Sequence, residues 1–155
     1  MSLEVWIIDG WNLYFSLSER HKNLTSPLSK DTYFSLLADF AAIQHRMLHV
    51  ILDGRCPTDE LKPFQTKQLN LDYSSRLSAD RVIERLIYES NAKNQLVVVT
   101  DDRAIAQNGR GAGVRVISTD EFKLLLDETK NEKKSFLLKK EGKTHGFSRP
   151  FGDKL

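Results

Sequence analysis

Cysteine is nearly absent from this 155-residue sequence, in which Cys56 stands alone. A single cysteine excludes an intramolecular disulfide and a zinc site built from several cysteines. Long apolar runs are missing too, since no segment approaches the roughly 18 consecutive apolar residues that a membrane-spanning helix needs. The first residues do not resemble a signal peptide. We therefore expect a soluble cytoplasmic protein with no membrane partner.

Histidine and glycine are also scarce. None of the 4 histidines is paired with another at the spacing of metal ligands. The one glycine-rich stretch, GRGAG at residues 109–113, follows an expected helix and precedes an expected strand. A dinucleotide-binding loop has the opposite order, strand and then helix. We therefore interpret Gly109 as a helix C-cap and the rest of the stretch as a turn.

Charge is unevenly distributed along the chain, although the net charge is only +2. Residues 1–129 hold 15 basic and 18 acidic side chains, whereas residues 130–155 hold 8 basic and 3 acidic ones. We expect one folded domain over residues 1–129 and a basic, partly disordered tail over residues 130–155. The tail is suited to a polyanionic partner, to a ribosome-like surface or to the domain itself, and a merely solvated tail is an equal alternative.

Apolar residues alternate between strand-like and helix-like patterns. Strands are expected at residues 3–8, 47–52, 68–73, 96–99 and 114–117, the third of them at a sheet edge. Helices are expected at residues 11–20, 31–46 and 78–90, after residue 102, and from residue 118. Ser29, and Ser118 with Glu121, have the spacing of helix caps. This alternation predicts an α/β fold with a mostly parallel sheet of about five strands, covered by helices on both faces.

Three of the expected strands end on acids: Asp9, Asp53, and the pair Asp101 and Asp102. The carboxyl ends of parallel strands meet at one edge of a sheet, which is where ligands bind in such folds. Asp80 lies in the first turn of a helix that enters from the same side, and Glu84 follows one turn later. Taken alone, each acid is better explained by a structural role: Asp80 by the helix dipole, Asp101 by a helix cap and Asp53 by a turn with Gly54.

Together the acids favour a metal site. Carboxylates gathered at one edge repel one another by amounts on the order of 1 kcal/mol or more at a few ångströms. A hard divalent cation such as Mg²⁺ or Mn²⁺, which prefers oxygen ligands, would offset that repulsion. Such an ion activates water and stabilises charge on a phosphoryl group, so the pattern predicts phosphodiester cleavage.

Three segments resemble a known family. IIDGWNL is similar to the opening of the NYN-domain ribonucleases, which belong to the PIN-like nuclease superfamily. YSSRLSADRVIERLIYE and VVVTDDRAIAQNGRGAGVRVIS resemble segments of the YacP-like branch of that family. The three lie in the family's order, and the similarity spans residues 3 to about 126. The resemblance implies a three-layer α/β/α, PIN-like (Rossmann-like) fold and metal-dependent endonuclease activity on single-stranded RNA.

The resemblance also implies roles for particular residues. Asp9, Asp80 and Asp102 fall on the metal-binding acids of the family, and Asn12 falls on an asparagine that orients a ligand or water. Asp53 matches a frequent acid, and Asp101 is an additional neighbour; both rank second as metal ligands. Thr100 and Arg103 support the site or cap a helix.

Basic and aromatic residues near the acids suggest how RNA would be held. The candidate phosphate contacts are Arg55, Lys62, Lys67, Arg76, Arg81, Arg103 and Arg110. Trp11, Tyr14 and Phe64 are candidate stacking surfaces for unpaired bases, with ordinary packing as the alternative for Trp11 and Tyr14.

The leading hypothesis is an endoribonuclease that uses Mg²⁺ or Mn²⁺ on single-stranded RNA, with mRNA or ribosome-associated RNA as candidate substrates. A second hypothesis is a catalytically silent module that binds RNA or the ribosome and keeps the PIN-like fold. An aspartyl-phosphate phosphatase is disfavoured, because it needs an acid two residues after Asp9, where Trp11 stands.

Overall fold

A five-stranded sheet forms the centre of the protein in the computed structural model, which describes residues 4–20, 28–55 and 60–148. All neighbouring strands are parallel, in the order β3-β2-β1-β4-β5. The strands are β1 Val5–Asp9, β2 Met47–Leu52, β3 Leu69–Tyr73, β4 Leu96–Val99 and β5 Arg115–Ile117. Each lies within two residues of its predicted bounds, and β3 lies at an edge as predicted.

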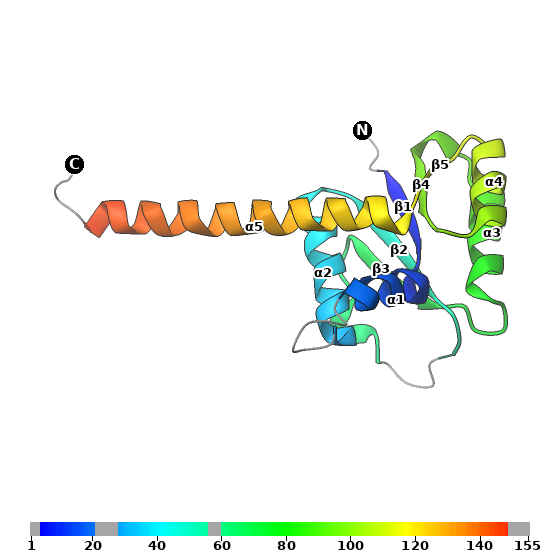
Figure 1. Cartoon of the computed structure of the whole chain (residues 1–155), viewed down its shortest axis with the longest axis horizontal. Coiled ribbons are helices and arrows are strands. Elements are labelled where there is room, and N and C mark those ends of the chain that lie inside the picture. Colours follow the sequence, from blue (N-terminus) through cyan, green and yellow to red (C-terminus); the bar gives the residue numbers. More distant parts are fainter. Residues whose placement is uncertain (1–3, 21–27, 56–59, 149–155) are drawn as a thin grey trace.

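Helices cover both faces of the sheet (Figure 1). They are α1 Gly10–Arg20, α2 Lys30–Ile43, α3 Ala79–Glu89, α4 Arg103–Gly111 and α5 Thr119–Ser148, with short 3₁₀ turns at Lys62–Phe64 and Lys93–Gln95. One core cluster joins α1, α2 and the first part of α5 to one face, and a second joins α3 and α4 to the other. The predicted three-layer α/β/α architecture is therefore confirmed.

The alternation of side chains along β1 shows how the strands serve both layers. Trp6 and Ile8 belong to the first cluster, whereas Ile7 belongs to the second. All four residues of β4 are buried. Strands buried on both faces need continuous apolar sequence, and this is why VWII and LVVV carry no polar residue.

The order of the strands determines where a ligand can bind. From β1 the chain builds outward through β2 and β3, and then returns to place β4 on the other side of β1. In parallel α/β sheets, ligands bind beyond the carboxyl ends of the strands where the order reverses in this way. Here that point lies between β1 and β4, and Asp9 is the last residue of β1.

The last helix is longer than predicted. α5 begins with the expected capping box, in which the Glu121 N–H donates to Ser118 Oγ and the Ser118 N–H donates to Glu121 Oε1. It does not end near residue 129 but continues to Ser148, so most of the expected tail is helical. Its second half projects beyond the rest of the molecule (Figure 1).

Two contacts fix the middle of α5 to α2. Lys133 forms an ion pair with Asp39 at 2.8 Å, and the Gln44 side-chain amide donates to Thr129 Oγ1 at 3.0 Å.

Among the described residues, no helix is long and apolar enough to cross a membrane.

The structure of the GRGAG stretch differs from the predicted one. Gly109 is not the C-cap: it lies inside α4 and is buried, and a Cβ there would lie 3.0 Å from Val116 Cγ2. Gly113 takes the left-handed conformation instead, with φ of +88°, after the C-cap residue Ala112. A small residue is therefore needed at 109 for packing, whereas the backbone conformation at 113 requires glycine.

Candidate functional site at the carboxyl edge of the sheet

Asp9 is positioned by an abrupt change from strand to helix. It ends β1, and Gly10 begins α1 without an intervening loop. A Cβ at Gly10 would collide with Leu52 Cδ2 and lie 2.8 Å from Val50 Cγ1 in β2, so only glycine allows this close approach. The Asn12 N–H donates to Asp9 Oδ1 at 3.3 Å. The half-buried Asp9 carboxylate is thus held at the N-terminus of α1, where the helix dipole favours negative charge.

Asp53 follows β2 and connects it to α3. Its Oδ1 accepts a hydrogen bond of 2.9 Å from the Ala79 N–H, at the first residue of α3. Gly54, with φ of +119°, makes the turn, and its N–H donates to Ser74 Oγ at 3.0 Å. Asp53 is therefore held beside the residue that precedes Asp80.

Asp80 and Glu84 lie on the first two turns of α3. The helix begins at the N-cap Ser78, whose Oγ accepts from the Arg81 N–H at 3.2 Å. The four-residue spacing places both carboxylates on one side of the helix. They bring two more negative charges to the edge at which Asp9 and Asp53 lie.

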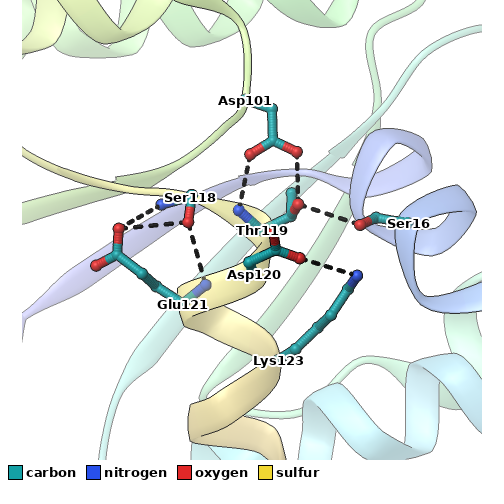
Figure 2. Close-up of polar contacts among 7 residues, drawn as sticks. All are labelled: Ser16, Asp101, Ser118, Thr119, Asp120, Glu121 and Lys123. Atoms are coloured by element: carbon teal, nitrogen blue, oxygen red, sulfur yellow. Dashed lines mark hydrogen bonds and ion pairs between the residues drawn. The ribbon is translucent and has the colours of Figure 1, made fainter. Parts of the chain in front are cut away.

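The adjacent acids Asp101 and Asp102 have separate positions. Asp102 is the N-cap of α4, and its Oδ1 accepts from the Ile105 N–H at 2.9 Å. Asp101 instead bonds to the first residue of α5: Thr119 donates its N–H to Asp101 Oδ1 at 3.0 Å and its hydroxyl to Asp101 Oδ2 at 2.5 Å (Figure 2). Ser16 of α1 lies 3.1 Å from the same hydroxyl. Both oxygens of Asp101 are therefore engaged in fixing α5 to the domain.

Asp9 and Asp80 each lie within electrostatic reach of several other acids of this edge. Burial raises the pKa of Asp9 from its ordinary value of 3.8 to about 6, against a lowering by the hydrogen bond from Asn12. Repulsion from three carboxylates adds to the increase, and these belong to Asp80, Asp53 and Asp102. The pKa of Asp80 is also raised, first by burial and then by repulsion from Asp102, Glu84 and Asp53.

No cation in the described part of the chain forms an ion pair with these acids. Among the residues that the structure describes, none of Asp9, Asp53, Asp80 and Asp102 forms an ion pair. The hydrogen bonds that described helix N–H groups donate to these acids reach Oδ1 of Asp9, Asp53 and Asp102. The same part of the chain contains no group of three or more His, Cys, Asp or Glu close enough together to hold one ion directly. The acids share an edge, but they do not form a compact cage.

The carboxylate oxygens are nevertheless the type of ligand that Mg²⁺ or Mn²⁺ prefers. Mg²⁺ retains several waters and binds proteins through one or two carboxylates, completing its shell with substrate phosphates. Uncompensated carboxylates that raise one another's pKa supply the oxygen chemistry and negative charge that such an ion prefers. The described residues thus supply oxygen donors of the kind a hydrated hard cation takes, and they form no closed cage of protein ligands.

The candidate phosphate contacts are all exposed, but they do not all lie beside the acids. Arg55 follows Asp53 closely, Arg76 lies in the turn before α3, and Arg81 and Arg103 each follow an acid of the site. Lys67 lies two residues before β3. Its neighbour Gln68 accepts a hydrogen bond through its carbonyl from the Leu48 N–H near the start of β2, so Lys67 lies toward the amino ends of the strands, opposite the acids. Lys62 belongs to the 3₁₀ turn between β2 and β3.

The aromatic candidates are engaged in packing. Trp11 Nε1 donates to the Asp53 carbonyl at 3.1 Å, and the Lys30 amine lies 5.2 Å from the centre of a Trp11 ring. The Tyr14 hydroxyl donates to the Leu28 carbonyl at 2.8 Å. Phe64 packs against Phe34, with ring centres 5.1 Å apart. All three are half-buried, and Trp11 tightens the link between α1 and the turn that carries Asp53.

Comparison with known proteins gives consistent results. A family model described as the YacP-like NYN domain matches residues 6–153. No curated protein matches the sequence. Among solved structures, the fold is similar to that of Rae1 (YacP) from Bacillus subtilis, with a TM-score of 0.70 and 18% identity over 94% of this chain and 85% of that one. The W164L mutant of the same protein gives a TM-score of 0.69 and 15% identity over 90% and 85%.

Proposed function

Because the chain belongs to the family of YacP-like NYN domains, we propose that it is a divalent-metal-dependent endoribonuclease that hydrolyses phosphodiester bonds in single-stranded RNA. Family membership supports a hydrolase of the nuclease type acting on RNA. The metal and the reaction are inferred from the carboxyl edge of the sheet. The observation that carries the proposal is the raised pKa of Asp9 beside three further carboxylates with no ion-pair partner among the described residues.

Asp9, Asp80 and Asp102 would hold Mg²⁺ or Mn²⁺, with Asp53 as a further oxygen donor. Asp101 is left out of this set, because Thr119 occupies both of its oxygens. A bound ion of this kind lowers the pKa of a water molecule and offsets negative charge on a phosphoryl group.

The protein itself orients the carboxylates. Backbone N–H groups at the starts of α1, α3 and α4 fix one oxygen each of Asp9, Asp53 and Asp102, and the second oxygen has no hydrogen bond to any described residue. Three rigid helix starts thus present free carboxylate oxygens at one edge. Asn12 contributes through the N–H that orients Asp9.

RNA would reach this edge through basic groups that offset the repulsion between phosphates and carboxylates. Arg55, Arg76, Arg81 and Arg103 are exposed and lie close in sequence to the acids. Each phosphate contact releases counterions, so affinity should fall steeply with salt. In the cytoplasm, mRNA or ribosome-associated RNA would supply unpaired substrate.

The proposal is tested by cleavage of an end-labelled, unstructured oligoribonucleotide with Mg²⁺, with Mn²⁺ and with EDTA. Wild type should cleave with either metal and not with EDTA. Asp102→Asn should lose cleavage yet keep its fold, because asparagine caps helices about as well as aspartate. Asp39→Asn, which changes an acid paired with Lys133 away from the site, is the matched control and should cleave like wild type.

A catalytically silent RNA-binding module is the alternative, and the absence of a compact group of ligands among the described residues favours it. It predicts RNA binding that survives EDTA and no cleavage with either metal. Equal cleavage by wild type and by the Asp9→Ala, Asp102→Ala double variant would show that these acids are not catalytic.

A further inference from the structure

A surface hollow lies between α3 and α4, next to the acidic edge. Its volume is about 350 Å³, and it is lined by Leu77, Arg81, Glu84, Arg85, Tyr88 and Asn108. Five of these residues come from α3 and the turn before it, and Asn108 comes from α4. The carboxylate of Glu84, one wall of the hollow, also repels Asp80. The hollow therefore begins where the acidic site ends.

Tyr88 has no role in the core. Its side chain is 84% exposed, whereas α3 packs on the sheet through Ala79, Ile83 and Ile87 on its other side. Leu77, at the other end of the hollow, is 36% exposed. An exposed aromatic ring is the usual surface on which an unpaired base stacks.

The charged residues of the hollow suit a phosphate. Arg81 and Arg85 are exposed, and neither forms an ion pair with any residue that the structure describes. An arginine can donate two parallel hydrogen bonds to one phosphate. The Asn108 amide adds a donor and an acceptor of the kind that reads the edge of a base.

The helix fixes the distance between this hollow and the acids. Arg81, Arg85 and Tyr88 follow one another at four- and three-residue spacing, so they share one side of α3. Tyr88 lies eight residues after Asp80, which is about 12 Å along the axis at 1.5 Å per residue. A base on Tyr88 would thus lie beside the reacting phosphate and not at it.

We propose that this hollow binds one unpaired nucleotide next to the scissile bond, with its base stacked on Tyr88 and its phosphate held by Arg85 and Arg81. The inference rests on the proposed function and defines how the same site holds its substrate. A second hollow of about 380 Å³ lies across α4, with Arg103 and Arg110 among its lining residues, but it has no aromatic side chain. Stacking therefore distinguishes the hollow beside α3.

The test measures binding of a short fluorescent oligouridylate by anisotropy in EDTA, where no cleavage occurs. Tyr88→Ala should weaken binding roughly tenfold, as expected for the loss of one base–aromatic stack. Tyr88→Phe keeps the ring and should bind within about twofold of wild type. Because Tyr88 is so exposed, neither change should affect folding.

Arginine variants provide an independent test of phosphate binding. Arg85→Ala should weaken binding and reduce the slope of log affinity against log salt by about 0.7, the value for one phosphate contact on a single strand. Arg115→Ala is the matched control, because Arg115 is exposed at the start of β5, toward the opposite edge of the sheet. It should bind like wild type.

Binding by Tyr88→Ala and Arg85→Ala equal to that of wild type would overturn the inference. Cleavage with Mn²⁺ separates this failure from failure of the proposed function. If wild type cleaves RNA and both variants bind and cleave normally, only nucleotide binding in the hollow is refuted. If wild type binds RNA through Tyr88 but never cleaves it, only the nuclease activity is refuted. If wild type does not bind the oligouridylate at all, nucleotide binding in the hollow is refuted, and the hollow would then serve a partner of another class.

Discussion

Replacing Asp9 by asparagine should stabilise the metal-free protein at neutral and alkaline pH. Asparagine has the same shape, and its side-chain oxygen can still accept the hydrogen bond from the Asn12 N–H. The substitution therefore removes a negative charge from the acidic edge and leaves the local packing intact. A charged residue that repels its neighbours lowers the free energy of unfolding of the metal-free protein. Such a cost in stability is expected at a site that binds a ligand.

The magnitude follows from the shifted pKa. Asp9 titrates at about 6 in the folded protein and at its ordinary 3.8 when unfolded. Over this interval the folded form binds more protons, so stability falls as pH rises from about 4 to 6 and is constant above that window. At about 1.4 kcal/mol per unit the upper bound is on the order of 3 kcal/mol. Solvent screening of a half-buried group reduces the expected gain for Asp9→Asn to about 1–2 kcal/mol at pH 8.

Urea unfolding in EDTA, followed by circular dichroism at pH 4 and pH 8, measures this effect. Wild type and Asp9→Asn should have similar free energies of unfolding at pH 4 and differ at pH 8. Asp39→Asn removes a charge that is paired with Lys133, so it should show no gain at pH 8. The reasoning is refuted if Asp9→Asn is no more stable than wild type at pH 8, or if its advantage is the same at both pH values.

Three further changes test the supports of the site, each by urea unfolding. Thr119→Val removes the hydroxyl that donates to Asp101, so it should cost about 1–3 kcal/mol, and a neutral result would show that this contact does not hold α5. Gly10→Ala would force a methyl group into Leu52 and should cost about 1–3 kcal/mol or more, unlike the same change at an open site. Gly113→Ala has open space but a positive φ, so it should cost about 1 kcal/mol from backbone strain alone.

The arrangement of the sheet was predictable because the strands are buried on both faces and their sequence shows it. Runs such as VWII and LVVV leave little alternative to a parallel sheet under helices. Once the strands are parallel, Asp9 and Asp53 must lie at one edge. The electrostatic coupling between these two acids, Asp80 and Asp102 is what the pattern of strand ends predicts.

The different positions of Asp101 and Asp102 could not be predicted. The two residues are chemically identical neighbours after β4. One caps α4, and the other bonds to Thr119, which is 18 residues later in sequence. Only the packing of α5 beside α1 decides between them. For a similar reason Lys67 was expected near the acids: it follows Asp53 in sequence, but the chain returns to the opposite edge before β3 begins.

The length of α5 could not be predicted from the pattern of buried residues either. Past Thr129 the described side chains of the helix are exposed, and the excess of basic residues there predicts a solvated tail. These residue types are nevertheless good helix formers, so a helix already anchored by its first three turns can continue into solvent. The prediction that Gly109 is a C-cap is wrong. A glycine near a helix end is typical of a cap, whereas here it allows α4 to approach Val116.

Anomalous scattering from a crystal soaked in Mn²⁺ tests the central claim most directly. The account predicts one strong peak at the carboxyl edge, next to the Asp9 carboxylate and within reach of Asp80 or Asp102, and no such peak in a soaked crystal of Asp9→Asn. No peak at that edge in wild type, or a peak only elsewhere on the molecule, would contradict the account.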